Sequence, residues 1–432
     1  MYGVSEKDLT NLNADAFRNG KLLNGALLEL PAQQVALIVD NTADEPASTS
    51  ADCAKEQLYA KDRTYKVALL LPLESSPVLQ GDLIVNSGAK TSDPAAERSR
   101  NADNFLEFYE GALLAVEDMK NLGMRMELSV FDLLKKGEDI ASLLNNNSLR
   151  NFDLIIGPAH AQEFQLVAEY AKQHSIRIVS PIDSRTEGLI QTNPYVFQVN
   201  PPTDAQYLKL FDGINVNNDK NVVLVYEEGL KEEALIEGLL DALEHHSETV
   251  KFVTYSPGKT RSARDTIMSF LRPLVDNRIV IASNNEVMVT EILSNLHQLS
   301  VLKKYDITVY GTSRWRNFDG IDLAYFHELR LHMAVPFFAD YDASTTKEFI
   351  VRYRDNFNAE PSQYAFQGYD VFTYFMQCLM NYGPRFDECF PSLSPRLLQS
   401  DYKFFRTDSR YGFINVDSAR IVYTPEYTIE RN

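Results

Sequence analysis

The sequence is poor in cysteine and has none of the usual motifs of a metal, redox or nucleotide site. Its three cysteines, Cys53, Cys378 and Cys389, form no CxxC pair, so no zinc or redox motif is indicated. A disulfide between Cys378 and Cys389 and two free, partly buried thiols are both compatible with this spacing. Neither GxGxxG nor GxxxxGK[ST] occurs. The sequence therefore indicates no phosphate loop and no cofactor.

Long apolar runs and excess positive charge are also missing. We find no apolar stretch of about 18 residues that could cross a bilayer, and the first residues are too polar for the core of a signal peptide. The formal net charge is −18 and the isoelectric point is near 4.9. A nucleic-acid backbone and an anionic membrane surface would both repel such a chain, so neither is an expected partner.

The 432 residues, 44% of them hydrophobic, are enough for two or three domains. Residues 1–31 read as a small unit with a helix start at Ser5 and a short strand ALLEL stopped by Pro31. Residues 32–64 are expected to form a linker, because 41–64 is rich in small and acidic residues without apolar periodicity. A new domain is expected to start near Tyr65.

From Tyr65 onward, strand-like and helix-like segments alternate. YKVALLLPL, MRMELSVFD, FDLIIGP and IRIVSP read as strands separated by amphipathic helices, and a second series runs from NVVLVYEEG to ITVYGTS. Alternation of this kind predicts right-handed crossovers and parallel sheets. The break at Pro201-Pro202 separates the two series. The expected fold class is α/β, with two doubly wound lobes, parallel sheets and a central cleft.

The order of these elements from about 65 to 432 resembles the type I periplasmic binding proteins, the group that contains the branched-chain amino-acid receptors of ABC transporters. The segments that carry the resemblance are YKVALLLPL, FYEGALLAVEDM, FDLIIGP, IRIVSPIDS, PSQYAFQGYDVFTYFMQ and YGFINVDSARIV. The resemblance implies a first lobe of residues 65–201 plus 343–395 and a second lobe of 202–342 plus 396–432. The chain would cross between them near 201, 338 and 395.

The front of the chain is similar to part of another module. Residues 2–31 resemble the second half of a LysM unit, with SEKDLTNLN matching its second helix and GALLELP its last strand. The first half of that unit is missing, so we expect no glycan binding by this segment. This resemblance also predicts that the chain was cut from a longer exported protein of the periplasm or cell envelope.

Carried over residue by residue, the ligand contacts of the binding-protein family fall on loops that follow strands. The predicted ligand-binding residues are Glu74, Ser75, Ala159, His160, Asp183 and Ser184 in the first lobe, and Glu227, Glu228, Asn284, Arg314 and Trp315 in the second. Asp183 places a carboxylate where the amino-acid receptors meet a ligand carboxylate, and at ~4 Å two like charges cost about 4 kcal/mol. The sequence therefore favours a small polar or cationic ligand, and the carboxylates Glu74, Asp183, Glu227 and Glu228 would attract cations.

Two further features admit alternatives. Trp315, the only tryptophan, stands between two arginines, so it is either an exposed marker of a binding surface or a plug at a lobe interface. Residues 74–102 form an unusually long connection that either covers the cleft or is a disordered surface excursion.

Enzyme motifs do not match. In HELRLH, His327 and His332 are five residues apart, which places them roughly 140° apart around a helix and prevents both from facing one metal ion. We expect this segment to lead into a strand, MAVPFF. No GxSxG elbow occurs, so we expect no catalysis.

Two functions from different classes follow from these patterns. The first is a solute-binding protein that captures a small polar ligand, amino-acid-like or cationic, for an ABC permease. The second is an envelope interaction protein that regulates peptidoglycan synthesis and has no small-molecule ligand.

Overall fold

The structure is a computed structural model, and it describes most of the chain after Arg63. The described residues are 17–18, 21–22, 63–73, 94–135, 137–182, 186–212, 214, 220–227, 250–255, 260–388 and 395–432. The chain divides into two compact units, Met1–Pro46 and Ala47–Asn432. In the first unit, β1 (Phe17–Arg18) pairs antiparallel with β2 (Lys21–Leu22). The predicted helix at Ser5, the strand ALLEL and the linker up to residue 62 lie outside the described residues.

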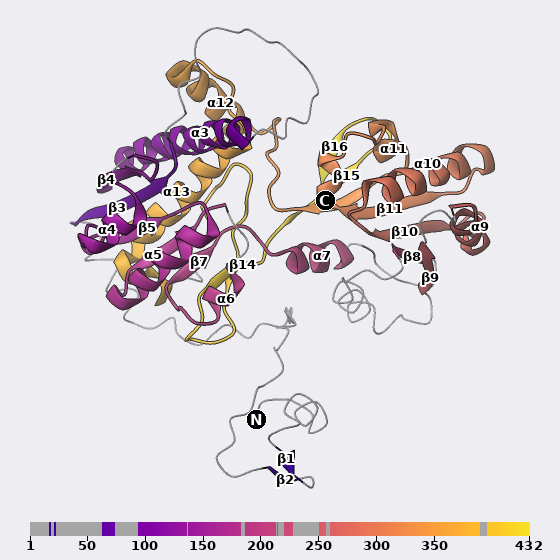
Figure 1. The fold of residues 1–432 in the computed structure, drawn as a ribbon. Helices are drawn as coiled ribbons and strands as arrows, with labels where there is room; N and C mark the ends of the chain where they lie inside the picture. Colours follow the sequence, from indigo (N-terminus) through magenta and orange to yellow (C-terminus); the bar gives the residue numbers. More distant parts are fainter. Residues whose placement is uncertain are drawn as a thin grey trace. The chain divides into compact units, whose positions relative to one another are not determined.

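The second unit contains two sheets, each seven-stranded over the described ranges (Figure 1). The first sheet has the order β13-β14-β7-β6-β5-β3-β4, and the second has the order β16-β15-β12-β11-β10-β8-β9. The strands are β3 (Thr64–Leu71), β4 (Arg125–Asp132), β5 (Leu154–Ile156), β6 (Arg177–Ser180), β7 (Val196–Gln198), β8 (Lys220–Glu227), β9 (Val250–Tyr255), β10 (Asp276–Ala282), β11 (Ile307–Thr312), β12 (His332–Val335), β13 (Phe404–Phe405), β14 (Phe413–Asn415), β15 (Ala419–Tyr423) and β16 (Ile429–Arg431).

Helices alternate with these strands, as the apolar periodicity predicts. They are α3 (Pro94–Asn121), α4 (Ile140–Asn145), α5 (Ala161–His174), α6 (Glu187–Ile190), α7 (Thr203–Asp212), α9 (Thr260–Phe270), α10 (Glu286–Lys303), α11 (Leu323–Glu328), α12 (Ser344–Phe357) and α13 (Gln363–Tyr382), with 3₁₀ helices η4 (Ser313–Asn317) and η5 (Gly383–Glu388). The helix predicted at KEEALIEGLLDALEHH lies outside the described residues.

The first sheet is covered by helices on both faces, which is why its strands read as unbroken apolar runs. Alternate residues of β3 face opposite layers: Leu69 packs with α3 and α13, and Leu70 packs with α4 and α5. The strands β3 to β7 pair in parallel. Each of these strands therefore has its carboxyl end at one common edge of the sheet.

Two glycines bring α3 and α13 into close contact beside the first sheet (Figure 1). A Cβ atom at Gly111 would lie 1.9 Å from the carbonyl oxygen of Ala365, and one at Gly368 would lie 1.9 Å from that of Phe108. No other residue type fits at either position without moving the backbone. The close contact therefore holds the segment of α3 near residue 110 and the segment of α13 near residue 366 in one layer of the first lobe.

The second sheet repeats this arrangement. Its parallel strands β8 to β12 place Val223, Ile279 and Val309 against α9, α10 and α11, while the opposite face meets Tyr207 and Leu210 of α7. The strands β15 and β16 join antiparallel at the β12 edge. The two doubly wound sheets predicted from the sequence are confirmed.

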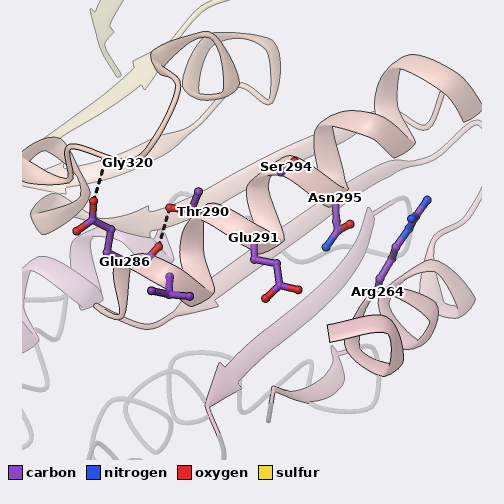
Figure 2. Close-up of a pocket in the computed structure, with 8 residues that line it drawn as sticks. Arg264, Glu286, Thr290, Glu291, Ser294, Asn295 and Gly320 are labelled. Atoms are coloured by element: carbon purple, nitrogen blue, oxygen red, sulfur yellow. Dashed lines mark hydrogen bonds between the residues drawn. The ribbon is translucent and has the colours of Figure 1, made fainter. Parts of the chain in front are cut away.

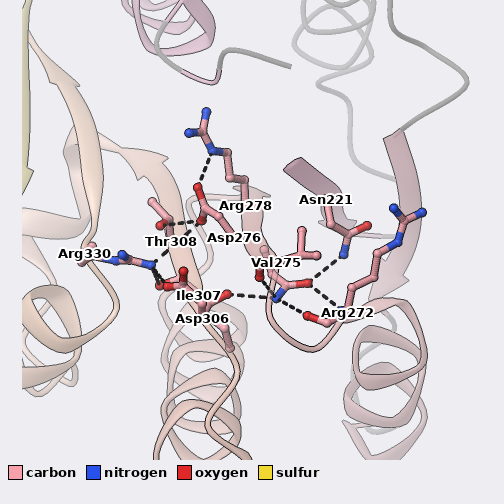
Figure 3. Close-up of polar contacts among 10 residues, drawn as sticks. Asn221, Arg272, Val275, Asp276, Arg278, Asp306, Ile307, Thr308 and Arg330 are labelled. Atoms are coloured by element: carbon pink, nitrogen blue, oxygen red, sulfur yellow. Dashed lines mark hydrogen bonds and ion pairs between the residues drawn. The ribbon is translucent and has the colours of Figure 1, made fainter. Parts of the chain in front are cut away.

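The amino edge of the second sheet is organised by the buried side chain of Asn277. Figure 3 labels its partners Asn221, Arg272, Val275 and Asp306. Its amide donates to the carbonyl oxygens of Arg272, Val275 and Asp306 at 3.0, 2.8 and 2.9 Å. Its side-chain oxygen accepts from the backbone N–H of Arg272 and from Asn221. This one side chain ties the turn before β10 to the strands on either side.

The strand pairings place the crossings between the sheets. The chain leaves the first sheet after β7, enters α7 at Thr203, and returns after β12 to α12 and α13, in agreement with the crossings predicted near 201 and 338. The crossing predicted near 395 is wrong, because β13 and β14 still pair within the first sheet. The chain passes to the second sheet at 416–418, where the amide of Asn415 holds the carbonyl oxygen of Val199 at 2.9 Å.

Cys378 is a free thiol buried in α13. Burial raises the pKa of this thiol well above its usual value. Cys53 and Cys389 lie outside the described residues, so the free-thiol alternative is established for Cys378 alone.

Candidate functional site

The first-lobe half of the site begins where β5 ends. Gly157 follows the strand with φ +89°, and a Cβ there would lie 2.3 Å from the carbonyl oxygen of Leu70, so glycine is required for this turn. Pro158 and the buried Ala159 lead to His160, the N-cap residue of α5. The predicted strand, turn and helix at 154–164 are confirmed.

His160 is exposed at this edge, and its side chain makes no capping hydrogen bond. Its ring packs edge-on against Phe105 of α3 with 5.6 Å between ring centroids. The aromatic contact orients the imidazole, and the exposed nitrogen atoms remain able to donate to or accept from a polar ligand. Ala159 can contribute only backbone and a methyl group.

A buried polar network supports the loop that follows β6. Gln367 of α13 donates to the carbonyl oxygen of Pro181 at 2.7 Å and to the side-chain oxygen of Asn200 at 2.9 Å. Asn200 in turn donates to the carbonyl oxygen of Ile182. Both flanks of the loop are therefore anchored, because Thr186 at its far side donates to Gln198.

Sequence reasoning did not identify this network. Gln367 and Gln198 are polar residues within otherwise apolar segments, YAFQGYDVF and YVFQVN, and both are almost completely buried. A buried amide needs partners, so each glutamine was a detectable signal of an internal polar contact. The predicted ligand residues Asp183 and Ser184 stand in the loop itself and lie outside the described residues.

The second-lobe half of the site lies at the carboxyl ends of β8, β10 and β11. Glu227 ends β8 and accepts from the amide of Asn285 at 3.2 Å. Asn285 also caps α10 through the backbone N–H groups of Val287 and Met288. The half-buried Asn284 accepts from the hydroxyl of Thr312 at 2.6 Å. These contacts fix polar side chains of three neighbouring strands along one edge.

Trp315 differs from both alternatives that the sequence left open. Its side chain is 0% exposed and lies in the core of the second lobe, where the indole N–H donates to the carbonyl oxygen of Ser283 at 2.9 Å. The prediction of an exposed aromatic is therefore wrong. The reason is the 3₁₀ helix η4, which directs Trp315 inward over Gly311 while its neighbours Arg314 and Arg316 stay exposed.

The structure thus places five of the predicted residues at or just after strand ends, whereas Trp315 is buried in the core. These are Ala159 and His160 in the first lobe, and Glu227, Asn284 and Arg314 in the second. Glu74, Ser75, Asp183, Ser184 and Glu228 lie outside the described residues, as does most of the 74–102 connection. The attraction of cations by four gathered carboxylates stays a prediction, since only Glu227 of the four is described.

The polar side chains at the strand ends can offer hydrogen bonds and charge to a ligand, so their chemistry is suited to binding. Glu227 can accept from an ammonium group, and Arg314 and His160 can donate to a carboxylate. The histidines of HELRLH lie in different elements: His327 belongs to α11 and contacts the carbonyl oxygen of Thr424, and His332 begins β12. The predicted path from this segment into a strand is confirmed.

A cavity of about 710 Å³ runs along the flank of the second lobe and starts at Glu286, next to Asn285 (Figure 2). Its walls are α9 at Arg264, the exposed side of α10 from Glu286 to Asn295, and Gly320, whose N–H donates to Glu286 at 2.7 Å. None of the predicted ligand residues lines it. We therefore base the candidate site on the strand ends.

No helix in the described ranges is both long enough and apolar enough to cross a membrane.

Comparisons with known proteins agree with this architecture. Residues 95–390 match the family model described as "Receptor family ligand binding region". No curated protein matches the sequence significantly.

Solved structures share the fold. A putative branched-chain amino acid ABC transporter protein from Rhodospirillum rubrum has 13% identity and a TM-score of 0.62, over 86% of this chain and 100% of that one. A branched-chain amino acid ABC transporter periplasmic ligand-binding protein from Burkholderia xenovorans LB400 has 11% identity and a TM-score of 0.55, over 85% and 94%. An ABC transporter substrate-binding protein from Desulfitobacterium hafniense, in complex with Leu, has 16% identity and a TM-score of 0.50, over 86% and 100%.

Proposed function

The chain belongs to the receptor family of ligand-binding regions and has the two-lobed type I periplasmic binding protein fold, and from this premise we propose that it is a non-catalytic solute-binding protein. It acts outside the cytoplasm and delivers its ligand to an ABC permease. The solved structures named above are ABC transporter proteins. They lend no support to the alternative of an envelope protein that regulates peptidoglycan synthesis.

One observation carries the proposal: polar residues stand at the carboxyl ends of parallel strands in each of the two sheets. In open α/β sheets, ligands bind beyond the carboxyl ends of the strands. His160 follows β5 in the first lobe, and Glu227 and Asn284 end β8 and follow β10 in the second. A ligand held by both groups of residues favours a closed arrangement of the lobes by its differential affinity.

The ligand that fits these residues is small and polar, and it is either amino-acid-like or cationic. Glu227 pairs with its ammonium group, and Arg314 and His160 donate to its carboxylate where it has one. Glu227 already accepts from the neutral amide of Asn285. The hydrogen bond orients this carboxylate and leaves its negative charge available to the ligand.

Thermal unfolding of the full chain with a panel of amino acids, polyamines and sugars tests the proposal. A true ligand at a hundred times its dissociation constant adds about 2.7 kcal/mol to the free energy of unfolding. Glu227→Gln should weaken a cationic or zwitterionic ligand, and Arg314→Gln should weaken only one with a carboxylate. Glu127→Gln, on the exposed side of β4, is the matched control. If no compound raises the melting temperature, the solute-binding proposal fails.

A further inference from the structure

A second cavity, of about 380 Å³, lies where the chain passes between the two lobes. Its walls come from both lobes. Tyr374 of α13 and residues 395–403 belong to the first lobe, and Lys209 of α7, Arg420 of β15 and Arg431 of β16 belong to the second. We call this cavity the crossover pocket. None of the residues of the candidate site lines it.

The crossover pocket is positively charged in a strongly acidic protein. The charged side chains that line it are Lys209, Lys403, Arg420 and Arg431, against Asp401 and Asp417. The side chains thus carry an excess of two positive charges, which the main-chain carboxylate of Asn432 in the same wall reduces to one, whereas the whole chain has a net charge of −18. Clefts lined by one sign of charge concentrate ions of the opposite sign.

The two carboxylates do not use all the hydrogen-bond donors of these cationic side chains. The ammonium groups of Lys209 and Lys403 lie 3.6 and 3.9 Å from Asp417, beyond the ordinary range of a hydrogen bond. Arg431 contacts Asp401, and both of these side chains are exposed. The lysines therefore keep N–H donors for another oxygen group.

Two buried polar atoms in the same wall have no hydrogen-bond partner among the described residues. They are Nε of Arg420 and Oγ of Ser418. A buried donor without a partner costs roughly 1–3 kcal/mol, and more when it is charged. Such atoms are rare in folded proteins, because a buried polar atom is normally paired with protein, water or an ion.

The nearby His332 lies in the positive electrostatic field of Arg420, a residue of the crossover pocket. Burial, together with the charges of Arg278, Arg420 and Arg330, lowers the pKa of His332 to about 4. His332 stacks on Tyr310 with 4.8 Å between ring centroids. The charge of Arg420 thus acts in a partly desolvated environment, where an anion gains more from it than in water.

We propose that the crossover pocket binds a small anion with at least two negative charges, such as a phosphate or polycarboxylate group. Nε of Arg420 and the hydroxyl of Ser418 donate to its oxygen atoms from the buried wall. Lys209 and Lys403 contribute charge from the open side. The bound anion contacts residues of both lobes, so it acts as an effector at a place separate from the ligand of the strand ends.

The test is a titration of the full chain with inorganic phosphate, pyrophosphate and citrate, with sodium chloride keeping the ionic strength constant. Calorimetry and thermal unfolding should both detect saturable binding of at least one of these anions. The phosphate and citrate arms distinguish phosphorus oxyanions from carboxylates. Arg420→Gln should raise the dissociation constant about tenfold or more, as expected for a lost charge-assisted hydrogen bond.

Two further variants keep the result interpretable. Lys403→Gln changes an exposed side chain, and it should also weaken binding. Arg410→Gln removes an exposed arginine that pairs with Asp408 outside the pocket, and it should leave the dissociation constant unchanged. The proposal is overturned if none of the three anions binds more tightly than chloride, or if Arg410→Gln weakens binding as much as Lys403→Gln.

Discussion

The carboxylate of Asp370, fully buried in α13, accepts a 2.7 Å hydrogen bond from the backbone N–H of Leu398. Its second oxygen accepts from the N–H of Gln399 at 2.9 Å. The carbonyl oxygen of Gln399 in turn accepts from the N–H of Phe338 at 2.8 Å, on the chain segment that returns from the second lobe. Asp370 therefore anchors two of the segments that run near the lobe junction.

This relationship predicts a pH dependence of stability. Burial raises the pKa of Asp370 to about 7, so between about pH 4 and 7 the folded state holds a proton that the unfolded state has released. The contribution of Asp370 to the free energy of unfolding is therefore highest at low pH. It falls as the pH rises, by at most about 1.4 kcal/mol per pH unit. Asp370→Asn should flatten this part of the profile in denaturant unfolding measured from pH 4 to 8. Asp355→Asn, on the exposed side of α12, should keep the wild-type profile, and equal slopes for all three proteins would contradict the prediction.

A second prediction concerns the contact between Gly311 and Trp315. A Cβ at position 311 would lie 2.2 Å from Cζ3 of the indole ring. Gly311→Ala should therefore lower the free energy of unfolding by about 1–3 kcal/mol, the usual effect of overpacking. Adding Trp315→Phe should recover part of this loss, because the smaller ring makes room for the methyl group.

The control for this pair is Gly188→Ala, since nothing lies within 4 Å of a Cβ at position 188. Its effect should stay within about 1 kcal/mol. Trp315 is the only tryptophan, so its fluorescence follows unfolding of the second lobe directly in the variants that retain it. Strictly additive effects of Gly311→Ala and Trp315→Phe would show that the two residues are not coupled.

The network at Asn277 gives a third prediction. Asn277→Asp would turn a side chain that donates to three backbone carbonyl oxygens into one that only accepts. We expect a loss of about 3 kcal/mol or more in the free energy of unfolding, as for other buried charges without a partner. Asn317→Asp introduces the same charge at an exposed position of η4. A loss at Asn277 no larger than that at Asn317 would refute this account.

A fourth prediction connects the polar network of the first lobe to ligand binding. Gln367→Leu leaves the carbonyl oxygen of Pro181 and the side chain of Asn200 without their donor. The loop after β6 should then exchange its amide hydrogens faster, and a ligand found in the panel above should bind more weakly. Gln377→Leu, at a half-buried position of the same helix, is the control. Unchanged exchange near residues 181–186 in Gln367→Leu would count against a supporting role for the network.

Local patterns predicted the elements of the fold well. The apolar runs of β3, β5 and β10 and the amphipathic α5 follow directly from periodicity. The crossings after β7 and after β12 were marked by Pro201-Pro202 and by the change from strand to helix. Each of these features depends on neighbouring residues, and such features are readable from one sequence.

The errors concern partners that are distant in the sequence. The segment YGFINVDSARIV reads as one closing unit of the second lobe, yet its strand β14 pairs with β7 and its strand β15 pairs with β12. Nothing in a three-residue strand such as FIN specifies its sheet, and here the contact of Asn415 with Val199 fixes it. The exposure of Trp315 was predicted from its charged neighbours. In a single turn of 3₁₀ helix, however, one side chain can point inward while the adjacent ones point outward.

The close approach of α3 and α13 also has a consequence during synthesis. Ribosomes release α3 early, but the partner surface around Gly368 appears only when residues 363–382 emerge. At a translation rate of about 5–20 residues per second, the apolar side of α3 stays without its partner helix for roughly 12–50 s. The nascent first lobe is therefore exposed to aggregation for most of translation, and factors that hold unfinished chains should affect its yield more than its final stability.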